Sequence, residues 1–349
     1  MATIKEIAKS AGVSIGTVSN VLNGISTVRD QARKRVLKAV EDLGYQPSML
    51  GRALRKEKTN MIVMIVPDIT NPFFPAAVRG AEDIAFQNGY RLVLCNSDND
   101  SSKEATYIRE MQTYRPSGLI IVPADLSKGL EEAKGYLKAG SGVVYVDRVP
   151  PKWRGDSVTS AHAEGAFAAT RHLIDLGHER IATITGPLTG TSAIARLEGY
   201  RRAMKSARLP IPRNYVQEAE FNRPAGHAKA AILLATTPRP TAIFAANDLI
   251  ALGVLAAIRE ARLECPRDVS VVGFDNLDES DVTLPTLTTV DQFAYQLGAK
   301  AAQTVIDRNV RKTGAAKQIV LSPELRVKGS TAPPPRERAT QTIGSRRRH

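Results

Sequence analysis

A set of polar and aromatic side chains stands just beyond the apolar stretches of this 349-residue chain, and together they could bind a small polar molecule. Asp147 and Asp275 can each accept two hydrogen bonds from hydroxyl groups, while Arg148 and Arg196 can donate to hydroxyl or ring oxygens. Amide side chains can do both, and phenylalanine rings can cover the apolar faces of a sugar ring. This is the chemistry of a sugar site, and its candidate residues are Asn71, Phe73, Phe74, Asp147, Arg148, Arg196, Phe221, Asn247, Asp275 and Gln292.

Each of these residues also has an ordinary structural explanation. An aspartate after a strand commonly caps a helix, an arginine near a helix start is commonly solvated, and paired phenylalanines commonly belong to a core. Polar groups and aromatic rings that gather together at strand ends are harder to explain in that way. The set as a whole therefore favours a ligand site.

The elements that must position these side chains alternate between strands and helices from Met61 onward. Short apolar runs predict buried strands, and the segments between them carry helical spacing, a pattern typical of doubly wound parallel sheets. Ligands bind beyond the carboxyl ends of the strands in such sheets. The predicted strands are 61–66, 91–95, 118–122, 142–146, 181–185, 242–245, 269–273 and 318–321, and the predicted helices are 76–88, 164–176, 192–207, 224–236, 248–261 and 296–309.

The first sixty residues have a different, all-helical pattern. Thr3 and Glu6 have the spacing of a capping box, so a helix is predicted to begin right after Thr3 and to end at Gly12. Ser14 is a suitable N-cap for a second helix that carries Val18 and its apolar neighbours inward. Two short helices joined by a glycine turn form a helix-turn-helix, whose second helix enters a DNA major groove. A third helix is predicted over 30–43.

The net charge of +13 is unevenly distributed. Residues 1–60 hold 11 Lys and Arg against 5 Asp and Glu, and residues 331–349 hold 5 against 1. A positive excess concentrated at the helix-turn-helix end is typical of phosphate binding. The basic end at 331–349 is also rich in Pro, Thr and Ser, so we expect a disordered tail there.

Several protein classes are disfavoured. No apolar run is long enough to span a membrane and no secretion signal is evident, so we expect a cytoplasmic protein. Cys95 and Cys265 are far apart in apolar surroundings, which predicts buried, unreactive thiols. No phosphate loop, dinucleotide fingerprint or nucleophile elbow occurs, and the five histidines lack metal-ligand spacing. We therefore expect no enzyme, no catalytic residue, no cofactor and no metal.

Three motifs together resemble the lactose-repressor (LacI) family of bacterial transcription factors: Thr3 to Asn23, Tyr45-Gln46-Pro47-Ser48 and Arg52-Ala53-Leu54. The resemblance extends over roughly residues 2–330. It implies a homodimer on a pseudo-palindromic operator, a hinge helix that folds on DNA, and Leu54 as a wedge between central base pairs. Ile15-Gly16 departs from the polar pairs common in the family, so the operator sequence is not readable. The implied DNA-binding residues are Thr3, Ser14, Ile15, Gly16, Thr17, Ser19, Asn20, Asn23, Arg29, Tyr45, Ser48, Arg52, Leu54 and Arg55.

The candidate sugar residues also resemble the ligand shell of ribose-binding proteins and ribose-type repressors. That resemblance adds Ser192, in Gly190-Thr191-Ser192-Ala193, to the effector-binding set. It implies two periplasmic-binding-protein-like lobes joined by three crossovers, with the stretch from 287 to 327 returning to the first lobe. Ser160-Ala161 departs from the Asp-Asn pair common at one crossover, which could alter hinge closure or ligand preference.

The predicted domains are a helix-turn-helix domain (1–47), a hinge helix and linker (48–60), a two-lobed α/β effector-binding and dimerisation domain (61–330) and a basic tail (331–349). We interpret the chain as a transcriptional regulator, a repressor, whose operator affinity a pentose or related sugar controls through allostery. Two alternatives are open: a regulator with a purine-like corepressor, and a sugar-binding transport protein. The effector's identity, the sign of its action, the regulated genes and the role of the tail do not follow from the sequence.

Overall fold

The computed structural model describes residues 2–22, 28–45, 59–126, 130–311 and 314–335. The chain divides into two compact units between Thr59 and Asn60. Five of the candidate DNA-binding residues lie outside the described residues, namely Asn23, Ser48, Arg52, Leu54 and Arg55.

The N-terminal unit contains α1 (Ile4–Ala11), α2 (Ile15–Leu22) and α3 (Asp30–Asp42). Thr3 and Glu6 form the predicted capping box: the Thr3 amide donates to Glu6 Oε2 (2.6 Å) and the Glu6 amide to Thr3 Oγ1 (3.4 Å). Gly12 ends α1 with a left-handed φ of 62°. Ser14 Oγ accepts a hydrogen bond from the Thr17 amide (3.1 Å) at the start of α2. The local sequence thus sets both ends of the turn between α1 and α2.

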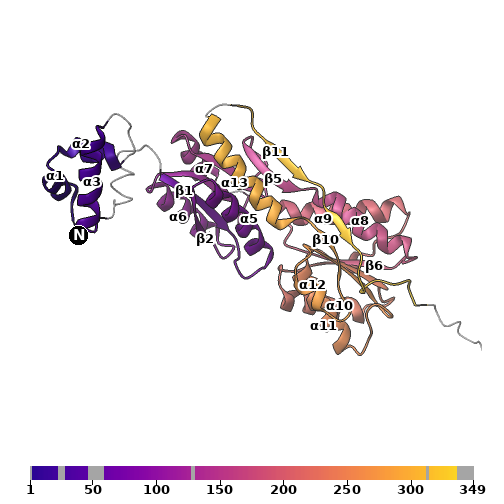
Figure 1. The fold of residues 1–349 in the computed structure, drawn as a ribbon. Helices are drawn as coiled ribbons and strands as arrows, with labels where there is room; N and C mark the ends of the chain where they lie inside the picture. The colour runs from indigo at the N-terminus through magenta and orange to yellow at the C-terminus, as the bar shows by residue number, and fades with distance from the viewer. Residues whose placement is uncertain (1, 23–27, 46–58, 127–129, 312–313, 336–349) are drawn as a thin grey trace, which may run out of the picture. The chain divides into compact units, whose positions relative to one another are not determined.

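Residues from 60 onward form two lobes, each built on a six-stranded sheet (Figure 1). The sheet of lobe 1 has the order β11-β5-β4-β3-β1-β2. Its strands are β1 (Thr59–Val66), β2 (Arg91–Asn96), β3 (Pro116–Ile121), β4 (Gly142–Val146), β5 (Asp156–Ser160) and β11 (Gln318–Leu321). Helices α5 (Phe73–Gln87) and α13 (Ala294–Arg311) pack on one face, and α6 (Ser101–Gln112) and α7 (Leu130–Lys138) on the other.

The sheet of lobe 2 has the order β12-β10-β9-β8-β6-β7. Helices α8 (His162–Asp175) and α9 (Thr191–Ser206) cover one face, and α10 (Arg223–Ala235) and α11 (Asp248–Glu260) the other. Its strands are β6 (Ile181–Thr185), β7 (Val216–Glu218), β8 (Ala242–Ala245), β9 (Ser270–Phe274), β10 (Thr288–Asp291) and β12 (Glu324–Arg326), and two short helices are η1 (Arg213–Tyr215) and α12 (Glu279–Val282).

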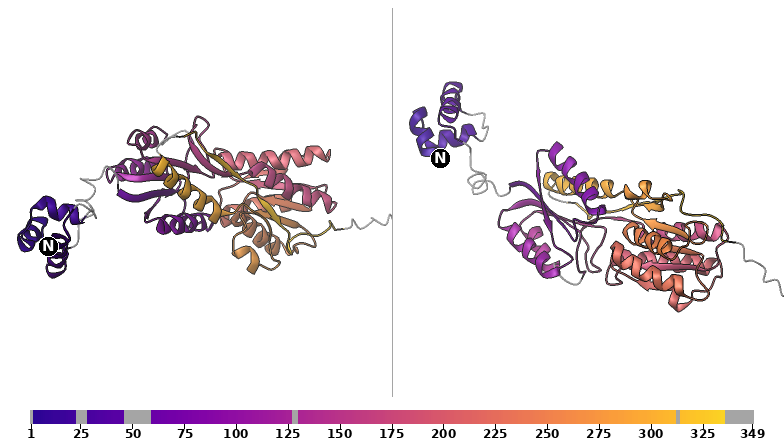
Figure 2. Two further views of the ribbon diagram at one scale, coloured as in Figure 1. Left: turned by 45° about the horizontal axis from the view of Figure 1, so that its top comes forward. Right: turned by 90° about the horizontal axis from the view of Figure 1, so that it is seen from below.

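Three short connections join the lobes, as the family resemblance implied. The chain crosses between β5 and α8, between β10 and α13, and between β11 and β12 (Figures 1 and 2). The prediction of doubly wound parallel sheets is confirmed, with one departure at an edge, where β12 pairs antiparallel with β10. The reason is directional: β10 leads out of lobe 2, and β12 enters lobe 2 beside it.

The C-terminal stretch stays attached to lobe 2 beyond the predicted boundary at 330. The Ala332 amide donates to Ser270 Oγ (3.1 Å), and Thr331 Oγ1 lies 2.9 Å from His172 Nε2. A disordered tail starting at 331 is therefore wrong for these two residues, because lobe 2 offers them buried hydrogen-bonding groups. Residues 336–349 lie outside the described part of the chain.

His178 of lobe 2 contacts this C-terminal stretch through a hydrogen bond. Its Nε2 lies 2.8 Å from the Ala332 carbonyl oxygen, and its Nδ1 lies 2.9 Å from Thr241 Oγ1. Burial lowers the pKa of His178, although the Ala332 carbonyl opposes this. A histidine with a lowered folded-state pKa contributes stability above its unfolded pKa of about 6.5 and loses it as the pH falls.

We therefore expect acidification from about pH 7 to 5 to lower the thermal midpoint of the wild type more than that of a His178→Gln variant, which cannot titrate there. Thermal unfolding monitored by circular dichroism measures the thermal midpoint of each protein as a function of pH, and the slopes of these two dependences are compared. His227→Gln is the matched control, because His227 is partly exposed and pairs with Glu260. Equal slopes for His178→Gln and the wild type would contradict the prediction.

Both cysteines are free. Burial raises the pKa of the Cys95 thiol, and it raises the pKa of Cys265 to about 12. Cys95 is buried as predicted, whereas Cys265 is only partly so, because it lies at the edge of the lobe 2 core.

Candidate functional site

The candidate sugar residues come together where the two lobes meet. Asp147 follows β4 of lobe 1 directly, and Asp275 follows β9 of lobe 2. Both have a left-handed backbone, with φ of 62° and 118°. Such a backbone costs about 1–3 kcal/mol in a non-glycine residue and is concentrated at functional sites. The surrounding structure therefore compensates the free-energy cost of both backbone conformations and holds the two carboxylates in place.

Arg196 of α9 lies at the centre of this group, and its side chain is buried. Its Nη1 donates to the Ala246 carbonyl oxygen (2.6 Å) and lies 3.7 Å from Asp275 Oδ1. Its guanidinium carbon lies 4.0 Å from the centre of the Phe274 ring. The solvated arginine of the ordinary explanation is therefore wrong here.

His162 is a site residue that sequence reasoning missed. Its Nε2 lies 3.2 Å from Asp147 Oδ1, and its Nδ1 lies 3.5 Å from Arg196 Nη2. It is the first residue of α8, just after a crossover, and so belongs to lobe 2. His162 thereby links the lobe 1 carboxylate to the lobe 2 arginine. The sequence signal for His162 was its place directly after Ser160-Ala161 at a crossover. Sequence reasoning also missed Phe274, which directly precedes Asp275.

The pKa values of the two aspartates are shifted in opposite directions. Burial raises the pKa of Asp147, but the hydrogen bond and charge of His162 and the charges of Arg196 and Arg148 outweigh it and lower the pKa to about 2. Burial raises the pKa of Asp275 well above its usual value, and Arg196 only partly opposes this. Asp147 is thus an acceptor, while Asp275 can offer a proton to a ligand oxygen.

Two candidate amides also have the capping role of the ordinary explanation. Asn247 Oδ1 accepts from the Ile250 amide (2.9 Å) at the start of α11, and Asn71 Oδ1 accepts from the Phe73 amide (3.1 Å) at the start of α5. Phe73 and Phe74 lie in the first turn of α5, which begins three residues earlier than predicted, and their rings meet edge to face with centroids 5.1 Å apart.

A cavity of about 250 Å³ opens between the lobes beside these residues. Lobe 1 contributes Asn71, Phe74 and Arg148 to its wall, and lobe 2 contributes Phe221, whose ring centre lies 6.0 Å from the guanidinium carbon of Arg148. Phe73 instead lines a neighbouring cavity between the lobes. The remaining residues of the wall are Asp68, Asn99, Ala124, Pro187, Thr189, Gly190, Glu220 and Asn222.

Several buried polar atoms at this junction lack a hydrogen-bond partner among the described residues. Buried polar groups in native proteins are nearly always satisfied, so each unpaired group points to a missing partner. Gln292 shows the pattern: Nε2 donates to Asp275 Oδ1 (2.5 Å), while Oε1 is unpaired. Ser192 is buried in the first turn of α9. Six of these atoms are Arg148 Nε, Ser160 Oγ, Thr185 Oγ1, Arg196 Nε, Asn247 Nδ2 and Gln292 Oε1.

The candidate base-reading positions of the helix-turn-helix are exposed. Ile15, Gly16 and Asn20 are exposed on α2, and Ile15 presents 45% of its surface to solvent. Among the other candidates, Thr3, Ser14 and Arg29 are exposed and Thr17, Ser19 and Tyr45 are partly buried, with Tyr45 packed against the core of this unit.

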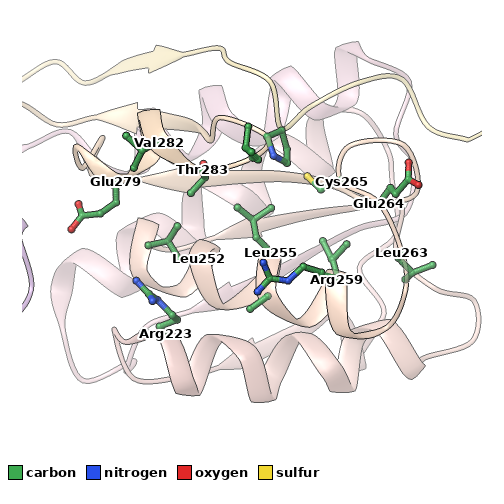
Figure 3. Close-up of a pocket in the computed structure, with 14 residues that line it drawn as sticks. Arg223, Leu252, Leu255, Arg259, Leu263, Glu264, Cys265, Glu279, Val282 and Thr283 are labelled. Carbon is green, nitrogen blue, oxygen red and sulfur yellow. The ribbon is translucent and has the colours of Figure 1, made fainter.

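Another cavity, of about 540 Å³, lies on lobe 2, between α11 and the segment after α12 (Figure 3). Leu252 and Leu255 of α11 form one wall, and Val282 and Leu284 lie on the other side. Val282 is 80% exposed and Leu284 is 97% exposed. We call these four residues the apolar face of lobe 2.

Within the described residues, no cluster of His, Cys, Asp and Glu could hold a metal ion. In the same part of the chain, no helix is long and apolar enough to cross a membrane.

Two family models match the chain: bacterial regulatory proteins of the lacI family over residues 3–48, and a periplasmic binding protein-like domain over residues 170–331. The ribose operon repressor of Escherichia coli is 37% identical over 330 residues, which cover 95% of this chain and all of the relative. The HTH-type transcriptional repressor PurR of Photobacterium profundum is 34% identical over 330 residues, covering 95% and 98% of the two chains.

Two solved structures are similar over most of their length. The lac repressor dimer bound to operator and an anti-inducer has a TM-score of 0.83 at 27% identity, covering 95% of this chain and 99% of that one. A LacI family regulator from Enterococcus faecium with bound ribose has a TM-score of 0.71 at 30% identity, covering 78% and 99%.

Proposed function

Because the chain belongs to the LacI family of bacterial regulatory proteins, we propose that it is a repressor whose operator affinity is controlled by a pentose or a closely related monosaccharide bound between the lobes. The observation that supports a sugar as the effector is the set of unpaired, buried polar atoms around Arg196 and Gln292. Hydroxyl groups both donate and accept, so a polyol ring could satisfy such a mixed set. The protein is assigned to the cytoplasm, where its operator lies.

The binding residues are proposed on the same ground. Asp147 and Asp275 bind hydroxyl pairs, the guanidinium groups of Arg148 and Arg196 donate to oxygens, and Phe221 covers a ring face. His162 joins this set through its contact with Asp147. The full proposed set adds Asn71, Phe73, Phe74, Ser192, Asn247 and Gln292.

Control of DNA binding follows from the two-lobed architecture. A sugar that contacts both lobes favours the lobe arrangement in which those contacts form, and it shifts the operator equilibrium only by its difference in affinity for the two arrangements. Such coupling is typically about 1–3 kcal/mol. The short crossovers are the proposed hinges, and Ser160 Oγ, unpaired among the described residues, stands at one of them.

A purine effector is the second candidate, because PurR relatives match the chain over as much of its length as the ribose operon repressor. The paired carboxylates and arginines suit hydroxyl groups better than a flat base, which favours the sugar. Isothermal titration calorimetry of the full chain against pentoses, hexoses, hypoxanthine and guanine decides between them. Binding of a nucleobase and of no sugar would overturn the proposal.

Operator binding requires two subunits in this proposal. A helix-turn-helix reads one half-site, so a two-fold dimer matches a pseudo-palindrome. The apolar face of lobe 2 is the proposed contact with the second copy. Around its cavity, Arg223 and Arg259 stand with Glu264 and Glu279, so a self-complementary contact could pair opposite charges.

Leu54 is the proposed minor-groove wedge, on the strength of the family resemblance, and it lies outside the described residues. Leu54→Ala is expected to weaken operator binding about tenfold or more, because an inserted apolar side chain supports the DNA bend. Fluorescence anisotropy with labelled operator measures this, and sugar affinity should be unchanged. Leu37→Ala on the exposed face of α3 is the control. Equal operator affinity for Leu54→Ala and the wild type would remove the wedge role.

A further inference from the structure

A buried carboxylate lies behind the lobe 1 wall of the cleft cavity. Glu104 of α6 has no solvent exposure, and no ion pair to it is found among the described residues. Its Oε2 accepts a hydrogen bond from the Ala124 amide (2.6 Å), while Oε1 is buried without a partner in the same part of the chain. Burying a carboxylate is costly unless a charge or several donors compensate it. The position of Glu104 therefore calls for a role beyond packing.

The contacts of Glu104 lead to the cavity in two steps. Ala124 lines the cavity and is held by Glu104. The neighbouring Pro123 carbonyl oxygen accepts a hydrogen bond from Arg148 Nη1 (3.3 Å), and Arg148 also lines the cavity. The segment 123–124 thus ties the buried carboxylate to an arginine that faces the ligand site.

We propose that Glu104 is a positioning residue for the effector site: its carboxylate fixes the 123–124 segment and adds a second negative charge to that of Asp147, whose Oδ2 lies 3.6 Å from Arg148 Nε, in balancing the Arg148 guanidinium. This inference rests on the proposed function, since it assigns a role at the same site. Glu104 does not touch the cavity itself, because Ala124 stands between them.

Charge coupling supports the arrangement. Burial raises the pKa of Glu104 to about 7, while the Ala124 amide and the charge of Arg148 oppose the rise. The other charged groups that act on Glu104 are Asp125 and Glu132, and both raise its pKa further. The carboxylate of Glu104 in turn adds to the effect of burial in raising the pKa of Tyr145, whose hydroxyl is unpaired among the described residues. Glu104 thus exchanges its proton near neutral pH.

Ligand binding should displace this equilibrium in a defined direction. A sugar in the cavity covers the 12% of the Arg148 side chain that is still exposed, so its guanidinium depends more on the Glu104 charge in the complex than in the free protein. The ionised form of Glu104 is therefore favoured in the complex, and binding should release a proton. Sugar affinity should then rise with pH, by up to about tenfold for each unit by which binding lowers the pKa of Glu104.

The test uses the full chain and calorimetric titration with D-ribose, and with the other sugars of the panel, at pH 6, 7 and 8. Repeating the titration in buffers of different ionisation enthalpy gives the number of protons released. The wild type should bind more tightly at pH 8 than at pH 6 and release protons at pH 7. Glu104→Gln keeps an acceptor for the Ala124 amide. At every pH it should bind the sugar with about the lower affinity that the wild type shows at pH 6, and binding should release no proton from residue 104.

Glu110→Gln is the matched control, because Glu110 is exposed on the same helix. Glu104→Asp should restore part of the pH dependence, since it restores an ionisable group. A purely structural role predicts an equal loss of affinity at all pH values for Glu104→Gln, with the wild-type pH slope retained, and that result would overturn the inference. Asp275 could also titrate, but its contribution would persist in Glu104→Gln.

A measurement made without any ligand distinguishes a failure of this inference from a failure of the proposed function. Hydrogen exchange of the Ala124 amide should be faster in Glu104→Ala than in Glu104→Gln or the wild type. If no sugar binds but this difference is found, the proposed function fails and the positioning role of Glu104 at the cavity wall stands. If Ala124 exchanges equally in all three proteins, the inference fails whatever the ligand.

Discussion

An Arg196→Met variant is expected to lose about a hundredfold or more in sugar affinity and to keep its operator affinity in the absence of sugar. Arg196 is buried between Asp275, His162 and the Phe274 ring, and its Nε has no partner among the described residues. A hydrogen bond from a charged group contributes about 1.5–3 kcal/mol, and each 1.4 kcal/mol is a factor of ten in affinity. Loss of this guanidinium also removes one of the charges that lower the pKa of Asp147.

Calorimetry with sugar and fluorescence anisotropy with labelled operator measure the two affinities on the same preparation. Arg202→Met is the matched control, because Arg202 lies on the same helix but is exposed, where it pairs with Glu164 and lies over the Phe167 ring, away from the two aspartates. Thermal unfolding of both variants shows that the fold is intact. If Arg196→Met responds to sugar like the wild type, Arg196 is not part of the effector site.

A Leu284→Asp variant is expected to be monomeric at concentrations where the wild type is a dimer. Leu284 is 97% exposed, and a charge there would have to be buried in any contact between two apolar faces. Operator affinity should fall by about a hundredfold or more as well, because one subunit reaches only one half-site and the gain from linking two sites is lost.

Analytical ultracentrifugation measures the dimer dissociation constant, and fluorescence anisotropy the operator affinity. Ile232→Asp is the control, since Ile232 is 50% exposed on α10 of the same lobe but does not line the apolar face. The sugar affinity of the Leu284→Asp monomer should match that of the wild type, because the cleft lies within one chain. A dimeric Leu284→Asp variant would place the subunit contact elsewhere.

The sequence predicted the elements whose signals are local. The capping box at Thr3 and Glu6, the turn at Gly12 and the apolar runs of β4, β6 and β8 depend on neighbouring residues, and the structure confirms them. The resemblance added the return of the chain to lobe 1, which apolar periodicity does not reveal. The structure confirms this return for α13 and β11, whereas β10 and β12, at the two ends of 287–327, belong to lobe 2.

Two of the missed strands have weak local signals. β5 reads Asp-Ser-Val-Thr-Ser and β7 reads Val-Gln-Glu, so neither resembles an apolar strand. β5 is nevertheless buried, because β11 and β4 pair on its two sides. His162 was missed for a related reason: its partners Asp147 and Arg196 come from different lobes, and only the folded chain brings them within 3.5 Å.

The last crossover has a consequence for how the chain can be divided. β11 completes the edge of one sheet, and three residues later β12 begins to complete the edge of the other. Neither lobe is therefore a continuous stretch of sequence, and the matched segment 170–331 takes α13 and β11 away from the lobe to which they belong. A premature stop after α13 would turn the largely buried strands β5 and β10 into edge strands, so truncated products of this gene should aggregate rather than persist as free lobes.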